Sequence, residues 1–337
     1  MLPHSRATQE ERAVRARAPL RLGFAGGGTD FPDYYKREGG CVVSTAIDKY
    51  IYVIIKDRFD KNIRIGYSRT ELVESVDEIE HQLVREAMKK VGVHYGIEIA
   101  TMADIPSEGS GLGSSSSVTV GLLHALYTFK GQLVTPGQLA REACEIEIEI
   151  LGKPIGKQDQ YIAAYGGLRR IDFHSDETVA VSWVPMPEEQ KRRFSESLML
   201  FYTGITRNAD KILLEQKDNI AEKLLTLDKM KAQADEIYNA LIDGNLNRIG
   251  RVMDAGWRHK KLLATTISNS SINAYYEAAL DAGAIGGKVA GAGGGGFLLL
   301  FCTPDRQAHV RQALSSLREL PIGLERDGTK VILNARR

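Results

Sequence analysis

The sequence lacks the features that mark exported, membrane-spanning or disulfide-stabilised proteins. Its three cysteines, Cys41, Cys144 and Cys302, lie far apart in apolar surroundings, so we interpret them as reduced core residues. The N-terminal segment has no apolar core like that of a secretory signal, and no run of about 18 apolar residues occurs. We therefore expect a cytoplasmic protein without a membrane partner.

A strong net charge is also missing, because 44 Lys and Arg residues balance 43 Asp and Glu residues. No overall field favours nucleic acid or a membrane surface as a partner, so any anion binding must be local. The chain of 337 residues is long enough for two packed cores, since a single core stops growing near about 250–300 residues. These numbers leave the oligomeric state open.

Hydrophobic periodicity predicts a sheet-rich first part of the chain. Strand patterns with β-branched and alternating apolar residues occupy residues 41–56, 62–68 and 94–101. A proline-bearing, charged segment after Trp183 indicates a boundary between two domains. We predict three units: residues 1–14 as a loose N-terminal arm, residues 15–185 as the first domain and residues 186–337 as the second.

The second domain is predicted to mix strands and helices. It opens with a strand near residues 197–204, followed by three long helical patterns between about Asn208 and Gly283. A hairpin-like glycine-rich segment, a helix from about Pro304 and two short strands complete the chain.

One short segment, GSGLGSSSS at residues 109–117, joins a predicted strand to the N-terminus of a predicted helix. A helix N-terminus presents unpaired N–H groups and about half a positive charge, so glycines before it favour the close approach of a phosphate. A flexible turn with a serine N-cap explains the same residues. The Walker pattern is absent, since Lys288 after paired glycines is followed by Val289, and the segment lacks the last glycine of a dinucleotide fingerprint.

A carboxylate is predicted on the apolar face of a helix at residues 136–151. Glu147 shares this face with Ala143, Cys144 and Ile150. A buried acid is costly unless it is paired or holds a metal. Glu147 is therefore either salt-bridged in the core or a metal ligand, and both alternatives stay open.

Three further glycine-containing segments are candidates for binding a ligand or for catalysis. Asp159 follows the turn-rich GKPIGKQ, where Lys157 could keep it ionised or form a simple surface pair with it. Arg21 lies in an apolar, strand-like stretch that leads into GGGTDF, where Asp30 could accept substrate hydroxyl groups or act as a turn residue. Residues 286–297, GGKVAGAGGGGF, permit another close backbone approach or merely tight packing.

Taken together and in this order, these segments resemble the GHMP kinase family. RAPLRLGFAGGGTDF is similar to its first motif, IPSEGSGLGSSSS to its second, which wraps the phosphates of ATP, and KVAGAGGGGF to its third. The resemblance spans about residues 15–302. It implies a two-domain α+β fold, with an N-terminal domain of the ribosomal-protein-S5-domain-2-like type and a ferredoxin-like C-terminal domain with added helices. ATP and Mg²⁺ are the implied cofactors.

The resemblance also assigns roles to single residues. Asp159 matches the catalytic aspartate of the family, Glu147 its magnesium-binding glutamate and Ser115 the loop serine that also holds Mg²⁺. Arg21 matches the arginine beside the transferred phosphoryl group in the sugar-kinase branch. The nucleotide is expected on Gly109, Ser110, Gly111, Leu112, Gly113, Ser114, Ser115 and Ser116, and the acceptor on Gly27, Gly28, Thr29, Asp30, Lys157, Arg207, Gly291, Ala292 and Gly293.

One departure from the first motif of the family narrows the range of possible acceptor substrates. Where galactokinases carry GEHTDY this sequence has GGGTDF, so Gly27 and Gly28 replace the acid and the imidazole that contact galactose. This favours the branch whose first motif reads PLRLGFAGGGTDF, which this sequence resembles most. That resemblance implies phosphorylation of the anomeric hydroxyl of D-glycero-D-manno-heptose 7-phosphate, giving the 1,7-bisphosphate for nucleotide-activated heptose synthesis. A substrate that already carries a phosphate calls for a cationic clamp. Candidates for the clamp are Lys157, Arg169, Arg170 and Arg207.

Three functions stay open at this point. An anomeric sugar kinase is favoured, with heptose 7-phosphate or another sugar such as L-fucose as the acceptor. A kinase of the same family for an isoprenoid or amino-alcohol substrate is disfavoured by GGGTDF. A non-catalytic sugar sensor would not need Asp159 and Glu147, which are both present.

Overall fold

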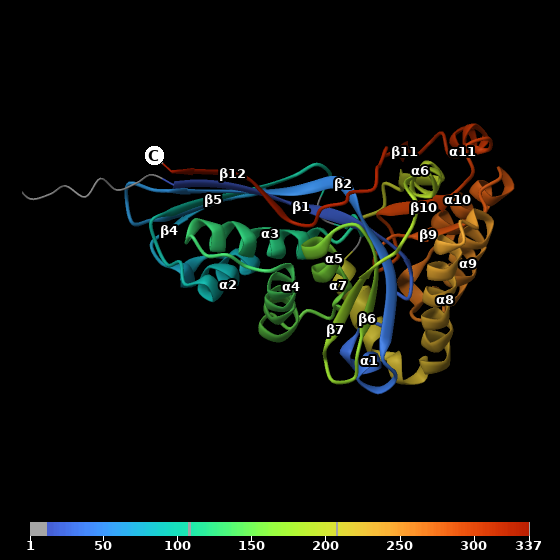
Figure 1. Ribbon diagram of the computed structural model, residues 1–337, viewed down its shortest axis with the longest axis horizontal. Helices are drawn as coiled ribbons and strands as arrows, with labels where there is room; N and C mark the ends of the chain where they lie inside the picture. The colour runs from blue at the N-terminus through green and yellow to red at the C-terminus, as the bar shows by residue number, and fades with distance from the viewer. Residues whose placement is uncertain (1–11, 107–108, 207, 337) are drawn as a thin grey trace, which may run out of the picture.

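The computed structural model describes residues 12–106, 109–206 and 208–336, which form two β-sheets with helices packed on them (Figure 1). In this part of the chain the first sheet has eight strands, which follow the order β12-β1-β2-β5-β3-β4, while β6 pairs with β2 and with β7. Its strands are β1 (Arg12–Ala25), β2 (Gly40–Asp57), β3 (Ile63–Gly66), β4 (Thr70–Val73), β5 (Ile97–Ala103), β6 (Leu168–Phe173), β7 (Val179–Trp183) and β12 (Lys330–Arg336).

Strand β2 is long enough to pair with different strands along its length. Residues 40–45 pair with β6 and residues 51–57 pair with β5, while β1 runs antiparallel beside both parts. The β-branched Val53 and Ile55 are fully buried on one face, as the alternating pattern predicts.

The two ends of the chain meet at one edge of the first sheet. Strand β12 pairs antiparallel with β1, so the last strand lies in the first sheet although it falls within the predicted second domain. Strand β1 begins at Arg12, inside the segment that we predicted as a loose arm. The limits 15–185 and 186–337 remain a prediction about folding units.

Helices of the first part of the chain pack under the first sheet, with α3 against β1 and β2 (Figure 1). They are α1 (Pro32–Glu38), α2 (Gln82–Val91), α3 (Ser114–Phe129), α4 (Pro136–Cys144) and α5 (Gln158–Tyr165), with the short 3₁₀ turn η1 (Val76–Glu78). Helix α4 starts at Pro136 after Thr135, whose side chain accepts from the N–H of Gln138. It continues as a π-helical segment, η2 (Glu145–Ile150), so the helix predicted at residues 136–151 is present with a wider final turn.

The second sheet has the order β11-β8-β10-β9. Its strands are β8 (Leu198–Tyr202), β9 (Gly286–Val289), β10 (Phe297–Phe301) and β11 (Arg318–Glu319). The helices of this part are α6 (Glu188–Glu196), α7 (Ala209–Asp218), α8 (Leu224–Ile242), α9 (Leu246–Lys260), α10 (Ser270–Asp281) and α11 (Gln307–Ala313), with the 3₁₀ turns η3 (Ile220–Glu222) and η4 (Thr265–Ile267). The predicted glycine-rich hairpin is confirmed, because β9 and β10 pair antiparallel.

Between Asn208 and Gly283 the described residues form four helices rather than the three that we predicted. The side chains of Asn208, Asn245 and Asn269 each accept a hydrogen bond from the first turn of a new helix. These caps divide an almost continuous helical periodicity into shorter pieces.

An aromatic contact joins the two sheets. The ring of Phe194 in α6 lies 5.1 Å from that of Phe24 in β1 and 6.0 Å from that of Phe301 in β10, measured between centroids. All three side chains are buried. Packing of this kind stabilises the arrangement in which loops from both sheets reach one cavity. None of the helices in the described residues is long and apolar enough to cross a membrane.

Candidate active site

A cavity of about 1430 Å³ lies where the loops of the two sheets meet. The first sheet and its helices contribute the glycine-rich loop at residues 109–116 and the segment that follows β1, and the second part contributes Lys260, Lys288 and Gly291. A single drug-sized ligand fills roughly 300–1,000 Å³. The cavity therefore has room for two small molecules at once.

The glycine-rich loop leads directly into α3 and leaves the start of that helix uncapped. Gly113 is the N-cap residue, with a φ of 79° that favours glycine, and no side chain of the described residues caps the helix. The serine N-cap that we considered as an alternative is therefore wrong. Ser114, Ser115 and Ser116 line the cavity in the first turn of α3, where unpaired N–H groups and the helix dipole favour an anion.

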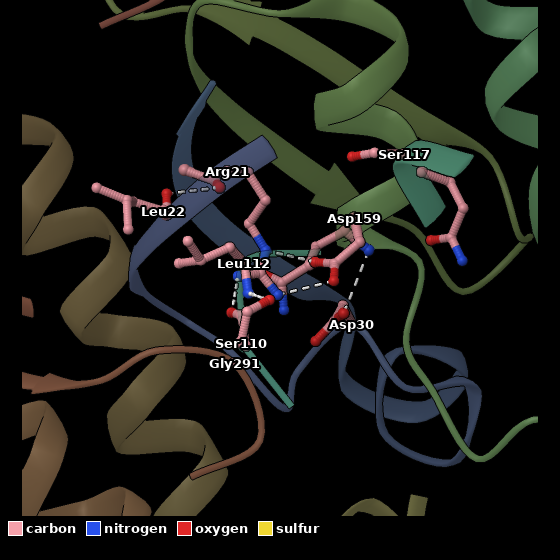
Figure 2. A network of polar contacts seen from close by, with 12 residues as sticks. Arg21, Leu22, Asp30, Ser110, Leu112, Ser117, Asp159 and Gly291 are labelled. Carbon is pink, nitrogen blue, oxygen red and sulfur yellow. Dashed lines mark hydrogen bonds and ion pairs between the residues drawn. The ribbon is translucent and has the colours of Figure 1, made fainter. Parts of the chain in front are cut away.

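Arg21 of β1 connects this loop to the first turn of α5. Its Nε and Nη2 donate to the two carboxylate oxygens of Asp159, each at 2.7 Å, and its Nη1 donates to the carbonyl oxygen of Gly111 at 2.6 Å. Figure 2 shows the Arg21 side chain between Leu112 and Asp159, with Asp30 close by. The backbone N–H of Arg21 also donates to the carbonyl of Leu112, whose side chain is buried in the core rather than lining the cavity. A bidentate pair of this kind fixes the orientation of the carboxylate.

The position of Asp159 differs from the prediction. It lies in the first turn of α5 and not in a loop beside Lys157, and its ion-pair partner is Arg21. The ammonium group of Lys157 lies 4.9 Å from the centre of the Tyr35 ring, and Lys157 is not among the residues that line the cavity. The Asp159 side chain keeps 22% of its surface exposed, so it is accessible from the cavity.

Ser115 and Glu147 lie side by side, 32 residues apart in the sequence. The hydroxyl of Ser115 donates to Oε1 of Glu147 at 2.6 Å, and Nε2 of Gln160 donates to Oε2 at 2.8 Å. Glu147 is fully buried, as the helical face predicted, and Lys153 places its ammonium 2.7 Å from the Ser115 hydroxyl and 3.5 Å from Glu147 Oε1. Two hard oxygen atoms beside an anion-binding helix end fit Mg²⁺, which takes few protein ligands and completes its shell with phosphate oxygens and water. The ion pair with Lys153 agrees with the salt-bridge alternative for Glu147, and the metal role stays a prediction.

Another part of the cavity is built around Asp30, which we predicted to bind the acceptor. Its Oδ1 accepts from the N–H of Gly28 at 3.0 Å and its Oδ2 from the N–H of Gln158 at 3.2 Å. Burial raises the pKa of Asp30 above its ordinary value, and the nearby charge of Asp159 acts in the same direction, while the two N–H donors oppose them. Gly156 passes so close that an added Cβ would lie 2.0 Å from Oδ2 of Asp30.

The other residues predicted on the acceptor side divide into two groups. Gly27, Gly28, Gly291 and Ala292 line the cavity together with Asp30. Thr29 does not, because its buried hydroxyl bonds the carbonyl groups of Gly26 and Cys41 and holds the turn together. Gly293 does not line it either, since it packs against Ile267.

The predicted clamp for a substrate phosphate is not found among the arginines that the structure describes. Arg169 lies against the Trp183 ring, 3.3 Å from its centre. Arg170 pairs with Asp172 and Asp235 on the surface of the first sheet. Neither lines the cavity, and Arg207 is outside the described residues.

Several lining residues were not predicted. They include Lys153, Gln158, Gln216, Lys260 and Lys288, and also Tyr67, Ser68, His81 and Leu83. Lys288 carried a usable signal, because a lysine within the apolar, glycine-rich GGKVAGAGGGGF is an unexpected buried charge. Gln216 carried none, since its neighbour Gly28 comes from a distant part of the chain, and the contact of Lys153 with Ser115 spans 38 residues.

Comparison with known proteins places this geometry in a family. Residues 79–167 match the family model described as GHMP kinases N terminal domain, and residues 233–319 match GHMP kinases C terminal. The chain is 30% identical over 320 residues to D-glycero-alpha-D-manno-heptose 7-phosphate kinase of Campylobacter jejuni subsp. jejuni serotype O:2, covering 90% of this chain and 93% of the relative. It is 29% identical to L-fucokinase/L-fucose-1-P guanylyltransferase of Bacteroides fragilis, covering 89% of this chain and 36% of that protein.

Solved structures agree with this assignment. The crystal structure of a D-glycero-D-manno-heptose 1-phosphate kinase from Bacteroides thetaiotaomicron matches with a TM-score of 0.80 and 27% identity, covering 95% of this chain and 99% of that one. The fold, the matched domains and the relatives show that the chain belongs to the GHMP kinase family. It is a sugar kinase, a phosphotransferase with an alcohol group as acceptor, from a family that uses ATP as the phosphate donor.

Proposed function

We propose that this kinase transfers the γ-phosphoryl group of ATP to the anomeric hydroxyl of D-glycero-D-manno-heptose 7-phosphate, giving the 1,7-bisphosphate. The observation that carries the proposal is the network in which Arg21 binds both Asp159 and the carbonyl of Gly111. It joins the phosphate-binding loop to the acceptor side of the cavity at one point. The similarity to the Campylobacter jejuni heptose 7-phosphate kinase supports this choice of sugar.

In the proposed reaction, the phosphates of ATP lie on the loop at residues 109–116 and on the uncapped start of α3. Mg²⁺, when bound at Ser115 and Glu147, supplies charge neutralisation on the phosphate oxygens. Glu147 is held in place for this role by Gln160, which donates to its other oxygen at 2.8 Å. Lys153 contacts the same two side chains and adds a further positive charge beside the phosphates.

Asp159 orients the acceptor hydroxyl and takes its proton. As the bond between the acceptor oxygen and the γ-phosphorus forms, the bond from that phosphorus to the bridging oxygen breaks, and ADP leaves with the bonding electrons. Arg21 keeps the Asp159 carboxylate in one orientation and brings positive charge to the moving phosphoryl group. Asp30 accepts hydrogen bonds from other hydroxyl groups of the sugar, in the pocket formed with Gly27 and Gly28.

The experiment that tests this function uses the purified protein, Mg-ATP and a panel of hexoses and heptoses with and without terminal phosphates. ADP release identifies the acceptor, and phosphorus NMR of the product identifies the hydroxyl that was phosphorylated. We expect turnover with heptose 7-phosphate and a product with a new anomeric phosphate. Turnover with heptose 7-phosphate that adds the phosphate elsewhere, or no turnover with it while another sugar reacts, would contradict the proposal.

One other acceptor class has specific support. The similarity to the L-fucokinase of Bacteroides fragilis favours a free 6-deoxy sugar as the second candidate. The clamp candidates that the structure describes in Arg169 and Arg170 lie outside the cavity, which agrees with a smaller, unphosphorylated acceptor. The same panel separates the two candidates, because it contains L-fucose.

A further inference from the structure

We propose that Lys288 is a catalytic residue of this kinase, which donates hydrogen bonds to the transferred phosphoryl group as a second cation beside Arg21. The inference rests on the proposed function only in placing the acceptor at Asp30 and Asp159. It assigns a role to a side chain of the second sheet that the mechanism above does not use.

The position of Lys288 is the first argument. It lies on β9, opposite Leu299 of β10, and it is one of the residues that line the cavity although only 8% of its surface is exposed. Its ammonium group interacts electrostatically with both Arg21 and Asp30. All three residues line the same cavity, and in the proposed function Arg21 contacts the moving phosphoryl group and Asp30 the sugar, so Lys288 is available to both.

The missing partner of Lys288 is the second argument. Among the described residues, no carboxylate or carbonyl oxygen accepts a hydrogen bond from its ammonium group, and the Asp30 oxygens already accept from the N–H groups of Gly28 and Gln158. Lys153 and Lys260, the other lysines of the cavity, both donate to protein oxygens. A nearly buried ammonium without acceptors is costly, and its three donors are free for a ligand. An anionic ligand oxygen offsets this cost more than a neutral hydroxyl does, because it stabilises the charged form.

Electrostatics around Lys288 agree with this role. Burial and, to a smaller extent, the charge of Arg21 lower the pKa of Lys288, Asp30 opposes both, and the net result is a pKa of about 8. From α9, which packs against β9, the nearby charged groups are Lys260 and Asp254, and Asp254 accepts from the hydroxyl of Tyr276 on α10. Strand β10 contributes only the uncharged residues of Phe297–Phe301 on the other side. A bound phosphoryl group therefore faces two cations, one from each sheet.

Lys288 makes and breaks no covalent bond in this proposal and keeps its proton throughout. Its charge stabilises the negative charge on the phosphoryl oxygens while the bond to the acceptor forms and the bond to ADP breaks. The lysine comes from the second sheet, so the reacting centre is complete only when the loops of both sheets are in contact.

The test compares Lys288→Met and Lys288→Arg with a matched control, Lys229→Met, which removes an exposed lysine of α8. The acceptor is the sugar that the wild-type protein phosphorylates fastest, so a wrong assignment of the sugar does not affect the comparison. Loss of a preorganised donor at a reacting oxyanion costs about 10²–10³-fold in kcat. We expect a loss of this size in Lys288→Met, with KM for the acceptor and Kd for Mg-ADP within about threefold of wild type, and no change in the control.

The pH profile supplies a readout that a structural role would not change. In the wild type we expect kcat/KM to fall as the pH rises through about 8, because the free lysine loses its proton there. Lys288→Arg should retain part of the activity without this decline up to about pH 9.5, since arginine stays protonated. A second measurement needs no acceptor: Mg-ADP with fluoroaluminate, a mimic of the transferred phosphoryl group, should bind Lys288→Met at least about tenfold more weakly than wild type.

Three results would overturn the proposal. The first is a kcat of Lys288→Met within about threefold of wild type. The second is a raised KM for the acceptor at unchanged kcat, which would make Lys288 a sugar-binding residue. The third is an unchanged affinity of Lys288→Met for the fluoroaluminate complex. This would show that Lys288 does not contact the phosphoryl group, even if the variant were inactive for another reason.

Discussion

Two glycine-rich segments meet in the cavity, and they use glycine for different purposes. Residues 109–113 form a loop in which Gly109, Gly111 and Gly113 have positive φ values, and the loop leads into the uncapped N-terminus of α3. Residues 290–296 form the turn between β9 and β10, and the backbone of Gly291 and Gly296 packs against the first loop. The first segment leads into an uncapped helix end at the cavity, whereas the second, which lines the cavity at Gly291 and Ala292, also holds the first in place.

The contacts between the two segments are made by backbone atoms. An added Cβ on Gly291 would lie 2.6 Å from Cα of Gly111, and one on Gly296 would lie 2.5 Å from the carbonyl oxygen of Gly109. Lys260 donates to the carbonyl of Gly291 and supports the hairpin from α9. A glycine-rich stretch in a sequence can therefore indicate ligand approach or close packing, and only the neighbours in space distinguish the two.

The largest effect is expected from Gly296→Val, which breaks the packing between the segments. Its Cβ would meet the carbonyl oxygens of Gly109 and Ser110 at 2.5 Å, and its φ of 81° disfavours a branched side chain. We expect the free energy of unfolding to fall by about 3 kcal/mol or more and nucleotide binding to be lost at the same time. Denaturant unfolding and calorimetry with Mg-ADP measure the two effects. Binding lost without a change in stability would contradict the assigned holding role.

A smaller loss of stability with a complete loss of binding is expected from Gly113→Val. The backbone φ of 79° and an added Cβ 3.1 Å from Cγ of Arg21 cost about 1–3 kcal/mol, while the side chain blocks the phosphate position before α3. Gly92→Val is the matched control, because its φ of 72° carries similar strain and the nearest neighbour is the flexible end of Lys130. We expect only Gly113→Val to lose Mg-ADP affinity, by at least about 100-fold. Equal affinities of the two variants for Mg-ADP would contradict the phosphate position at Gly113.

The next effect concerns the metal rather than the nucleotide. Glu147→Gln keeps the shape of the buried side chain and removes its charge, so we expect the Mg²⁺ concentration for half-maximal activity to rise about 10–100-fold. Glu149→Gln, on the exposed side of the same π-helical segment, is the control. Mg²⁺ titrations at saturating ATP measure the change. An unchanged Mg²⁺ requirement in Glu147→Gln would leave Glu147 as a structural partner of Ser115 and Gln160.

The smallest effect is expected at the N-terminus of α2. This helix end lies at the same cavity and, unlike the N-terminus of α3, it has a side-chain cap. Nδ1 of His81 accepts from the N–H of Val84 at the start of α2, and burial lowers the pKa of His81 below 6.5. In the window between the lowered pKa and 6.5 the unfolded chain binds more protons, so stability falls as the pH falls through it. His81 is partly exposed, so we expect a loss of less than about 1 kcal/mol between about pH 7 and about pH 5. His81→Asn keeps a cap that does not titrate, and denaturant unfolding should show a smaller pH dependence in this variant. An identical pH dependence would exclude the neutral His81 ring as the cap.

Local features of this molecule can be predicted well from its sequence. The burial of Glu147 follows from its place on an apolar helical face, and the strand, glycine loop and helix around residues 109–117 follow from the change of hydrophobic period. The resemblance of three motifs to one family added the fold, the reaction class and the donor. Each of these inferences uses residues that are near one another in the chain.

Contacts between distant residues could not be predicted in the same way. Arg21 and Asp159 are 138 residues apart, so we paired Asp159 with its sequence neighbour Lys157, which instead lies over the ring of Tyr35. The pairing of β12 with β1 joins residues at opposite ends of the chain, and no local pattern indicates it. Lys153 reaches Ser115 through a turn that follows the π-helical segment, whose wider winding cannot be inferred from a period of 3.6 residues.

The most direct test of the account is the turnover of Asp159→Asn compared with its affinity for Mg-ADP. The substitution keeps the size of the side chain and removes the charge that orients the acceptor hydroxyl and takes its proton, while Asp243→Asn, an exposed aspartate after α8, serves as the control. We expect kcat with the best sugar acceptor to fall at least about 10²–10⁴-fold while Kd for Mg-ADP stays within about threefold of wild type. Unchanged turnover in Asp159→Asn would contradict the account.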